Sequence, residues 1–239
     1  MIDTHSHILP GVDDGSRSVE ESLEMLRQEA AQGVRRVVAT PHFYAHHDDL
    51  NRFLQRTAEA EARLREKMAD EKGLPELSVG AEVYFFQGIS DSELINRLTF
   101  DKKRCILIEM TQAPWGDAAY KELEGIAQKQ QLLPIVAHVD RYIRPFRTGG
   151  IPERLAELPV LVQANASFFL HPMTAPLALR MLRNDQIQLL GSDCHDLKDR
   201  KPNIGAAKAV IEKRLGTEVL QRLEEYEAQL QLESDEVSL

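Results

Sequence analysis

Two histidines at alternate positions near the start of the chain, His5 and His7, could hold a metal ion. They follow a short apolar stretch in the sequence MIDTHSH. Residues two positions apart point to the same side of an extended backbone, so both imidazoles could reach one ion. Such pairs also occur on protein surfaces, so further ligands must be sought elsewhere in the chain.

Similar side chains stand at the ends of the other apolar, strand-like runs: His42, Glu82, Glu109, His138, Asp193 and His195. Asp14 lies in the first loop, close enough to join them. Burying such groups without partners costs on the order of several kcal/mol each. A buried polar network without metal would have to pair all nine groups, so the set favours bound metal ions.

The types of these side chains indicate which metal and which chemistry they serve. Imidazoles and carboxylates without thiolates suit Mn²⁺, Fe²⁺ or Zn²⁺ rather than a structural zinc site of the cysteine type. Nine candidate ligands are too many for one ion and indicate two or three ions that share bridging carboxylates. Clustered ions generate a hydroxide nucleophile at neutral pH and stabilise an in-line displacement.

The runs that end in these residues have the composition of buried parallel strands. They are rich in Val, Ile and Leu with little alternation. We count seven of them: IDTH, RRVVAT, LSVGAEV, CILIEM, LPIVAHV, VLVQANA and IQLLGSD. Their repetition with helical patterns predicts a (β/α) barrel or an open doubly wound sheet, and both place function at the carboxyl ends of the strands.

Amphipathic helical patterns separate the strand-like runs. Ser18 and Glu21 have the spacing of a capping box at the start of the first helix, which ends near Gly33. Further helices are predicted over residues 50–73, 116–131, 151–158, 172–185 and 205–231. No repeat or linker divides residues 1–239, so we expect a single domain whose acidic end, about 231–239, is frayed.

Composition excludes several classes of function. The chain has 239 residues, 43% hydrophobic content and a formal net charge of −9. The negative charge argues against binding to nucleic acid or to an anionic membrane surface. Only Cys105 and Cys194 are present, and no leader or membrane-spanning run is found, so we expect a cytoplasmic protein without disulfides.

The order of the motifs resembles a known family, the polymerase and histidinol phosphatase (PHP) metal-dependent phosphoesterases, and within it the bacterial tyrosine-phosphatase branch. The opening DTHSHILPGVDDGS carries the resemblance, and TPHF, GAEVYF, ILIEM, IVAHVDRY, QANAS and GSDCHDLKDRKP follow in the family's order. The resemblance implies a distorted (β/α)7 barrel, in agreement with the seven strands counted above. HVDRY and QANASFFLHP depart from the family's usual stretches without affecting the candidate ligands.

The resemblance also implies how the candidate ligands divide among three ions: His5, His7, Glu82 and Asp193 on the first, Glu82, Glu109 and His138 on the second, and Asp14, His42 and His195 on the third. The expected metal is Mn²⁺, with Fe²⁺, Zn²⁺ or Co²⁺ as alternatives. Arg141 and Arg200 match arginines that family members aim at the substrate phosphate, so they are the candidate catalytic and substrate-binding residues.

The implied activity is hydrolysis of phosphotyrosine by a metal-bridging hydroxide. The implied partner is a phosphotyrosine protein, expected to be a bacterial tyrosine autokinase that controls capsule or exopolysaccharide synthesis, and the enzyme could form a homo-oligomer. Tyrosine's phenol has a pKa of about 10, so its phenolate leaves with little protonation. The first alternative is a small-molecule phosphatase related to histidinol phosphatase. Metal-dependent amidohydrolases, which also begin with His-x-His, and a non-catalytic module stabilised by metal are further alternatives.

A thiolate mechanism is a rival interpretation, because Cys194 and Arg200 have the Cys-x5-Arg spacing of cysteine-dependent tyrosine phosphatases. The intervening HDLKD contains no glycine and two aspartates, which suits neither a phosphate-binding loop nor a low thiol pKa. Trp115 could be either a packed loop anchor or an aromatic wall for substrate. His46, His47 and His171 are read chiefly as loop residues.

Overall fold

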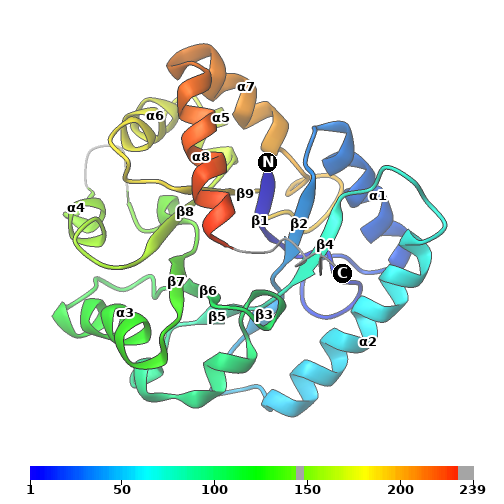
Figure 1. Ribbon diagram of the computed structural model, residues 1–239, viewed down its shortest axis with the longest axis horizontal. Helices are drawn as coiled ribbons and strands as arrows, with labels where there is room; N and C mark the ends of the chain where they lie inside the picture. Colours follow the sequence, from blue (N-terminus) through cyan, green and yellow to red (C-terminus); the bar gives the residue numbers. More distant parts are fainter. Residues whose placement is uncertain (144–147, 231–239) are drawn as a thin grey trace, which may run out of the picture.

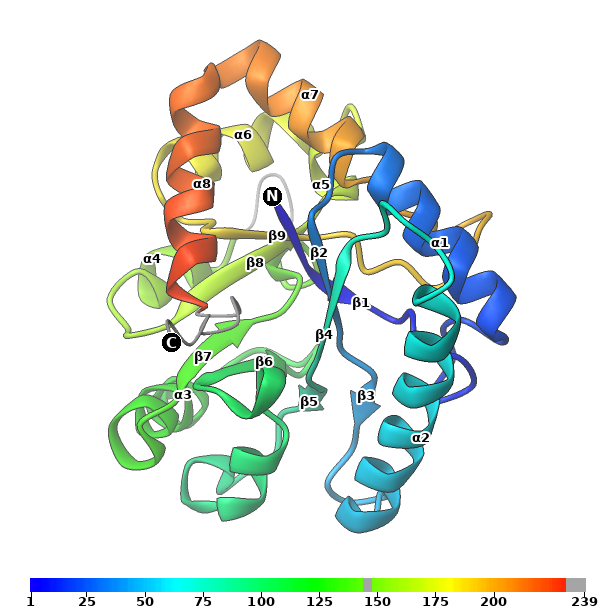
Figure 2. The ribbon, with the colours of Figure 1, turned by 45° about the vertical axis from the view of Figure 1, so that its right-hand side comes forward.

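A computed structural model of the chain describes residues 1–143 and 148–230. Within them, nine strands form: β1 (Ile2–Ser6), β2 (Arg36–Ala39), β3 (His42–Phe43), β4 (Glu76–Val79), β5 (Glu82–Tyr84), β6 (Cys105–Glu109), β7 (Leu133–Val136), β8 (Leu161–Asn165) and β9 (Leu189–Gly191). All the recorded pairings are parallel. Helices surround the strands in both ribbon views (Figure 1, Figure 2).

All seven predicted strand-like runs are strands in the structure, and two of them are interrupted. The run around β2 continues after Pro41 as β3, and the run around β4 continues after Ala81 as β5. Pro41 has no N–H to donate to a neighbouring strand, which favours a break at that point. As a result the strands divide into two sheets, of order β1-β2-β4 and β3-β5-β6-β7-β8-β9.

The two outer strands of these sheets, β1 and β9, come together and curl the arrangement. Ser6 and Cys194 form an isolated parallel bridge, and the His7 N–H donates to the Cys194 carbonyl at 2.9 Å. Buried Asp3 accepts hydrogen bonds from both the N–H and the hydroxyl of Ser192. The predicted α/β class with parallel strands is therefore confirmed, and the structure shows that the parallel strands form a curled arrangement.

The helices in the described residues are α1 (Val19–Ala31), α2 (Leu50–Met68), α3 (Asp117–Gln130), α4 (Ile151–Leu155), α5 (Ser167–Leu170), α6 (Ala175–Arg183), α7 (Ile204–Leu215) and α8 (Thr217–Gln229), with short 3-10 turns at 89–91, 93–97, 100–102 and 139–141. Ser18 is the N-cap of α1, as predicted, and its hydroxyl accepts from the Glu21 N–H. None of these helices combines the length and apolarity that crossing a membrane requires.

The prediction of one continuous helix over 205–231 is wrong. Gly216 interrupts it with a φ of 87°, a conformation that glycine adopts without steric cost, and α8 starts in a new direction. The short α5 was not predicted. The expected frayed tail at about 231–239 lies outside the described residues. Among the described residues, the buried hydrophobic side chains form one large cluster and one smaller cluster.

Candidate metal centre

His5 and His7 lie side by side at the end of β1, as their spacing predicts. Both side chains are buried, and their Nε2 atoms are 3.1 Å apart. At this distance the two ring nitrogens could both bind the same ion. The alternation of β1 thus brings two potential ligand atoms to one place.

Hydrogen bonds at the opposite ring nitrogens orient three of the imidazoles. The Nδ1 of His7 lies 2.7 Å from an Asp13 carboxylate oxygen, and the Nδ1 of His5 lies 3.3 Å from the Gln163 side-chain carbonyl. The Nδ1 of His195 lies 2.9 Å from the Asp193 carbonyl. Since each of these oxygens can only accept a hydrogen bond from an Nδ1–H, the neutral ring keeps the Nε2 lone pair for a ligand, the arrangement typical of metal-binding histidines.

Glu82, at the start of β5, lies among four imidazoles. Its Oε1 is 2.7 Å from the His138 Nε2. Its Oε2 lies 3.2 Å from the Nε2 of His5, 3.3 Å from that of His7 and 2.9 Å from the Nδ1 of His42. A carboxylate with both oxygens turned toward different histidines is suited to bridge two cations.

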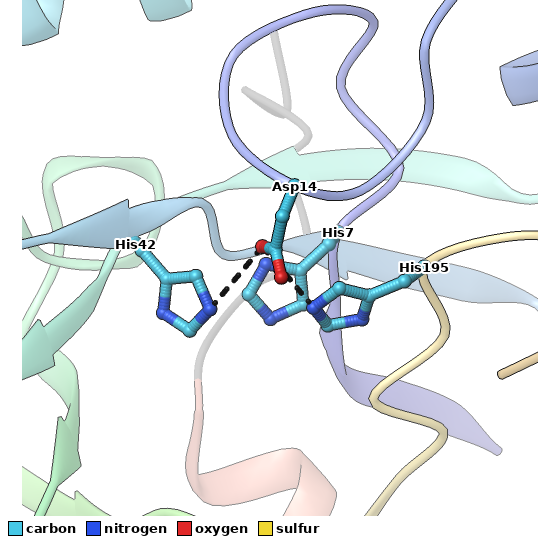
Figure 3. A group of neighbouring side chains, drawn as sticks. All are labelled: His7, Asp14, His42 and His195. Carbon is cyan, nitrogen blue, oxygen red and sulfur yellow. Dashed lines mark ion pairs between the residues drawn. The ribbon is translucent and has the colours of Figure 1, made fainter.

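A second group lies at the open side of the site, where Asp14 projects from the first loop between two histidines (Figure 3). Its Oδ1 lies 3.5 Å from the Nε2 of His42 and 3.5 Å from the Nε2 of His195. The Asp14 side chain is 65% exposed, whereas that of His195 is 4% exposed. Solvent therefore reaches this group from the Asp14 side.

The structure brings all nine predicted residues together, in overlapping groups whose potential ligand atoms lie within 4.8 Å of one another: His5, Glu82 and His138; His5, His7 and Asp193; His42, Glu82 and Glu109; and His7, Asp14, His42 and His195. The groups share members. The last group contains His7 in addition to the three residues expected for the third ion.

Arg141 and Arg200 lie at the edge of this cluster, and each donates to Asp193. The Nη2 of Arg200 is 2.7 Å from the Asp193 Oδ1, and Arg141 contacts the other carboxylate oxygen. Both guanidinium groups remain about one-third exposed. They line a pocket of about 270 Å³ together with Asp193, which suits them to bind an anion beside the cluster.

Two of the nine residues have strained backbones. His138 has a φ of 31° and Asp193 a φ of 52°, in the left-handed region that non-glycine residues rarely adopt. Hydrogen bonds hold both of them: the His138 N–H donates to Gln163 at 2.6 Å and the Asp193 N–H to the His5 carbonyl at 2.8 Å. Strain of this kind concentrates at functional sites.

The electrostatics of the cluster divide its members. Burial disfavours a charged His7, but hydrogen bonds to Asp13 and Glu82 outweigh burial and raise its pKa to about 10. Burial and the neighbouring His7 lower the pKa of His195 to about 4. Burial and the charge of Glu82 raise the pKa of Glu109, and a cation bound beside it would oppose that shift.

The unpartnered atoms of the cluster fit a set of divalent cations. Within the cluster, the His42 Nδ1, Glu82 Oε2, His138 Nδ1 and His195 Nε2 are buried and make no hydrogen bond, although the first two lie only 2.9 Å apart. Buried polar atoms normally have one. Imidazole nitrogens and carboxylate oxygens are the donors that Mn²⁺, Fe²⁺, Co²⁺ and Zn²⁺ accept.

Sequence reasoning missed the residues that support the ligands. Asp13 orients His7, Gln163 contacts both His5 and His138, and the Asn165 side-chain amide donates to Asp193 at 2.9 Å. Gln163 and Asn165 alternate along β8 just as the two histidines alternate along β1. This alternation of polar side chains in the run VLVQANA could have indicated that both residues face the site.

The rival thiolate interpretation does not fit the surroundings of Cys194. Its side chain is fully buried, and burial together with the charges of Glu29 and Asp3 raises its pKa well above the usual value. A substrate cannot reach a side chain with no exposed surface. A larger cavity of about 700 Å³, between α2 and residues 96–102, is lined by none of the nine candidate ligands.

Comparisons with known proteins identify the family of this chain. The sequence model of the family "Capsular polysaccharide synthesis, CpsB/CapC" matches residues 1–233. Tyrosine-protein phosphatase YwqE of Bacillus subtilis (strain 168) is 30% identical over 229 residues, covering 92% of this chain and 87% of that protein. Tyrosine-protein phosphatase CpsB of Streptococcus pneumoniae is 27% identical over 235 residues, covering 93% and 94% respectively.

A solved structure shares the fold. It belongs to a crystallographic study of YwqE from Bacillus subtilis and CpsB from Streptococcus pneumoniae, described as unique metal-dependent tyrosine phosphatases. The TM-score is 0.82 at 24% identity, and the match covers 98% of this chain and 96% of that one.

Proposed function

This chain belongs to the capsular polysaccharide synthesis family CpsB/CapC, and from that premise we propose that it is a metal-dependent protein-tyrosine phosphatase. The observation that carries the proposal is the convergence of nine imidazoles and carboxylates, with unpartnered buried atoms, beside two arginines. A cluster of this composition next to an anion-binding edge suits hydrolysis of a phosphate ester.

The residues that would hold the cations are those already brought together: His5, His7, Asp14, His42, Glu82, Glu109, His138, Asp193 and His195. We propose two or three ions, Mn²⁺ first and Fe²⁺, Zn²⁺ or Co²⁺ as alternatives. When bound, such ions act as Lewis acids that neutralise phosphate charge and make water a nucleophile near neutral pH.

The protein's own groups bind and orient the substrate. The guanidinium groups of Arg141 and Arg200 face the pocket beside Asp193, where they would hold the phosphate oxygens and stabilise the charge that builds on them. Asp13 and Gln163 keep the histidines of β1 turned toward the centre. The phenolate of tyrosine leaves with little protonation, so the reaction depends less on a general acid than that of an alkyl phosphate.

The finer features are part of the same proposal. The two sheets would act as one distorted seven-strand (β/α)7 barrel in a single domain, since β1 and β9 meet at Ser6 and Cys194. The substrate would be a bacterial tyrosine autokinase of capsule or exopolysaccharide synthesis. Buried Cys105 and Cys194, both outside any disulfide, suit a cytoplasmic location, and a homo-oligomer is compatible with the fold.

Metal removal and substrate comparison test the proposal. Protein treated with EDTA should lose hydrolysis of p-nitrophenyl phosphate and of a phosphotyrosine peptide, and Mn²⁺ should restore both. Arg200→Ala should lower kcat/KM on the peptide by about 100-fold without changing metal content. Full activity after thorough chelation, or a higher kcat/KM on histidinol phosphate than on the peptide, would contradict the proposal.

A further inference from the structure

Two neighbouring strands carry the same pattern of a candidate ligand, an apolar residue and a tyrosine. Along β3 the pattern is His42, Phe43 and, directly after the strand, Tyr44; along β5 it is Glu82, Val83 and then Tyr84. The middle residues are buried in the core on the outer side of the strands. Because side chains alternate along a strand, each tyrosine points to the same side as the ligand two positions before it.

The register of β3 and β5 places the two tyrosines side by side. His42 pairs with Glu82, and Phe43 pairs with Val83. The next step along both strands therefore brings Tyr44 next to Tyr84, and their ring centroids are 5.6 Å apart. The Tyr44 ring is also 5.6 Å from the ring of His42. The pair thus forms a layer immediately outside the candidate ligands, toward the carboxyl ends of the strands.

The rings of this layer are open to solvent. Tyr44 is 36% exposed and Tyr84 is partly exposed. Among the described residues, Tyr44 is one of three large hydrophobic side chains that are exposed, the others being Leu170 and Met173. Core packing therefore does not account for the presence of Tyr44 beside the site.

Trp115, the other aromatic candidate, packs within its own loop and against neighbouring tyrosines. Its Nε1 donates to the Thr111 carbonyl at 2.9 Å, and its ring packs 4.9 Å from Tyr142 and 5.7 Å from Tyr120. These contacts make it the anchor of its loop. The tyrosine pair remains as the aromatic surface next to His42.

We propose that Tyr44 and Tyr84 form an aryl-binding subsite, which holds the aromatic ring of a phosphoaryl ester while its phosphate lies at the metal centre. The inference rests on the proposed phosphatase function and names the feature that selects aryl over alkyl phosphates. Aromatic rings attract each other in offset or edge-to-face arrangements at centroid separations of about 4.5–7 Å, the range that the pair itself shows. An alkyl phosphate has no ring to place there.

Binding of non-hydrolysable ligands tests the subsite without catalysis. Benzylphosphonate carries a ring next to its phosphonate and methylphosphonate does not. Calorimetry on Mn²⁺-loaded protein should show tighter binding of benzylphosphonate. The double variant Tyr44→Leu/Tyr84→Leu should reduce that preference by about 3- to 10-fold. The double variant Tyr44→Phe/Tyr84→Phe, which keeps both rings, should preserve it.

Kinetics on matched phosphopeptides provide the second measurement. The leucine variant should raise KM for a phosphotyrosine peptide and leave KM for the phosphoserine peptide of the same sequence unchanged. Metal content should equal that of the wild type. Met173→Ala, which removes an apolar side chain that is 66% exposed, is the matched control and should change neither value.

The outcomes separate this inference from the proposed function. If the wild type hydrolyses the phosphotyrosine peptide and the leucine variant keeps the wild-type preference for benzylphosphonate, the subsite is wrong and the function stands. If the wild type hydrolyses no phosphotyrosine yet prefers benzylphosphonate through the two tyrosines, the function is wrong and the subsite stands. Equal losses for both phosphonates would also overturn the subsite.

Discussion

The hydrogen bond between Asp13 and His7 allows a prediction that isolates the role of a supporting residue. One Asp13 oxygen accepts from the His7 Nδ1 at 2.7 Å and from the His42 N–H at 3.1 Å, and the other accepts from the Gly15 N–H at 3.0 Å. In Asp13→Asn, the side-chain carbonyl can keep the bonds from the His7 Nδ1 and the His42 N–H, while the NH2 group faces the Gly15 N–H. The His7 ring then loses the carboxylate charge that orients it and makes its Nε2 a stronger ligand.

The expected magnitude follows from the loss of this charge. Loss of a carboxylate that orients a metal-bound histidine weakens metal affinity by about 10- to 100-fold, which corresponds to about 1.4–2.7 kcal/mol. The effect should fall on cation binding, because Asp13 touches His7 and not the phosphate pocket. The Mn²⁺ concentration for half-maximal activity should therefore rise by that factor, while kcat at saturating Mn²⁺ recovers most of its wild-type value.

The assay is a Mn²⁺ titration of p-nitrophenyl phosphate hydrolysis, with metal content measured after dialysis. Asp49→Asn is the matched control. Asp49 also accepts a backbone hydrogen bond, from Arg52 at 2.9 Å, and as the N-cap of α2 it is replaced by asparagine at little cost. A wild-type Mn²⁺ requirement in Asp13→Asn would refute the reasoning, as would full metal content with activity that excess Mn²⁺ does not restore.

Three further predictions concern buried groups near the site. Cys194→Ser should have a kcat/KM within about twofold of the wild-type value, because the thiol is buried away from the pocket. A loss of kcat/KM as large as that of Arg200→Ala would instead support the thiolate mechanism. Gly191→Ala should lower the free energy of unfolding by about 1–3 kcal/mol in thermal denaturation, because its Cβ would lie 2.6 Å from the His5 Cβ; Gly116→Ala, with open space around it, is the control. Burial and the charge of Asp3 raise the pKa of Glu29, so the folded protein keeps a proton that the unfolded chain has released. The free energy of unfolding should consequently fall as pH rises above about 5. In urea unfolding, Glu29→Gln should make this dependence on pH less steep. A dependence as steep as that of the wild type would contradict this role of Glu29.

The candidate ligands could be predicted because parallel strands bring their carboxyl ends to one place. His5, Glu82 and Asp193 each end an apolar run, so the rule for parallel strands alone places them at the same end of the sheet. Their grouping is now observed, while their role as ligands stays a prediction. Asp13 could not be singled out from its neighbour Asp14, since the path of the loop decides which carboxylate reaches His7.

The rest depended on pairing and backbone conformation. Tyr44 and Tyr84 stood in the sequence in matching positions, but only the pairing of His42 with Glu82 shows that they meet. The break at Gly216 required a positive φ that a helical pattern does not reveal. The interruption at Pro41 likewise divided one predicted strand between two sheets.

The joining of β1 to β9 has a consequence for how the protein matures. Asp3 and Ser192 are 189 positions apart, and the groups around His5 draw on both ends of that interval. A nascent chain therefore cannot complete these groups until its last strand has left the ribosome. With cations bound as proposed, their loading and the closing of β1 onto β9 would be one cooperative event, and a bound ion would resist separation of the two ends of the fold.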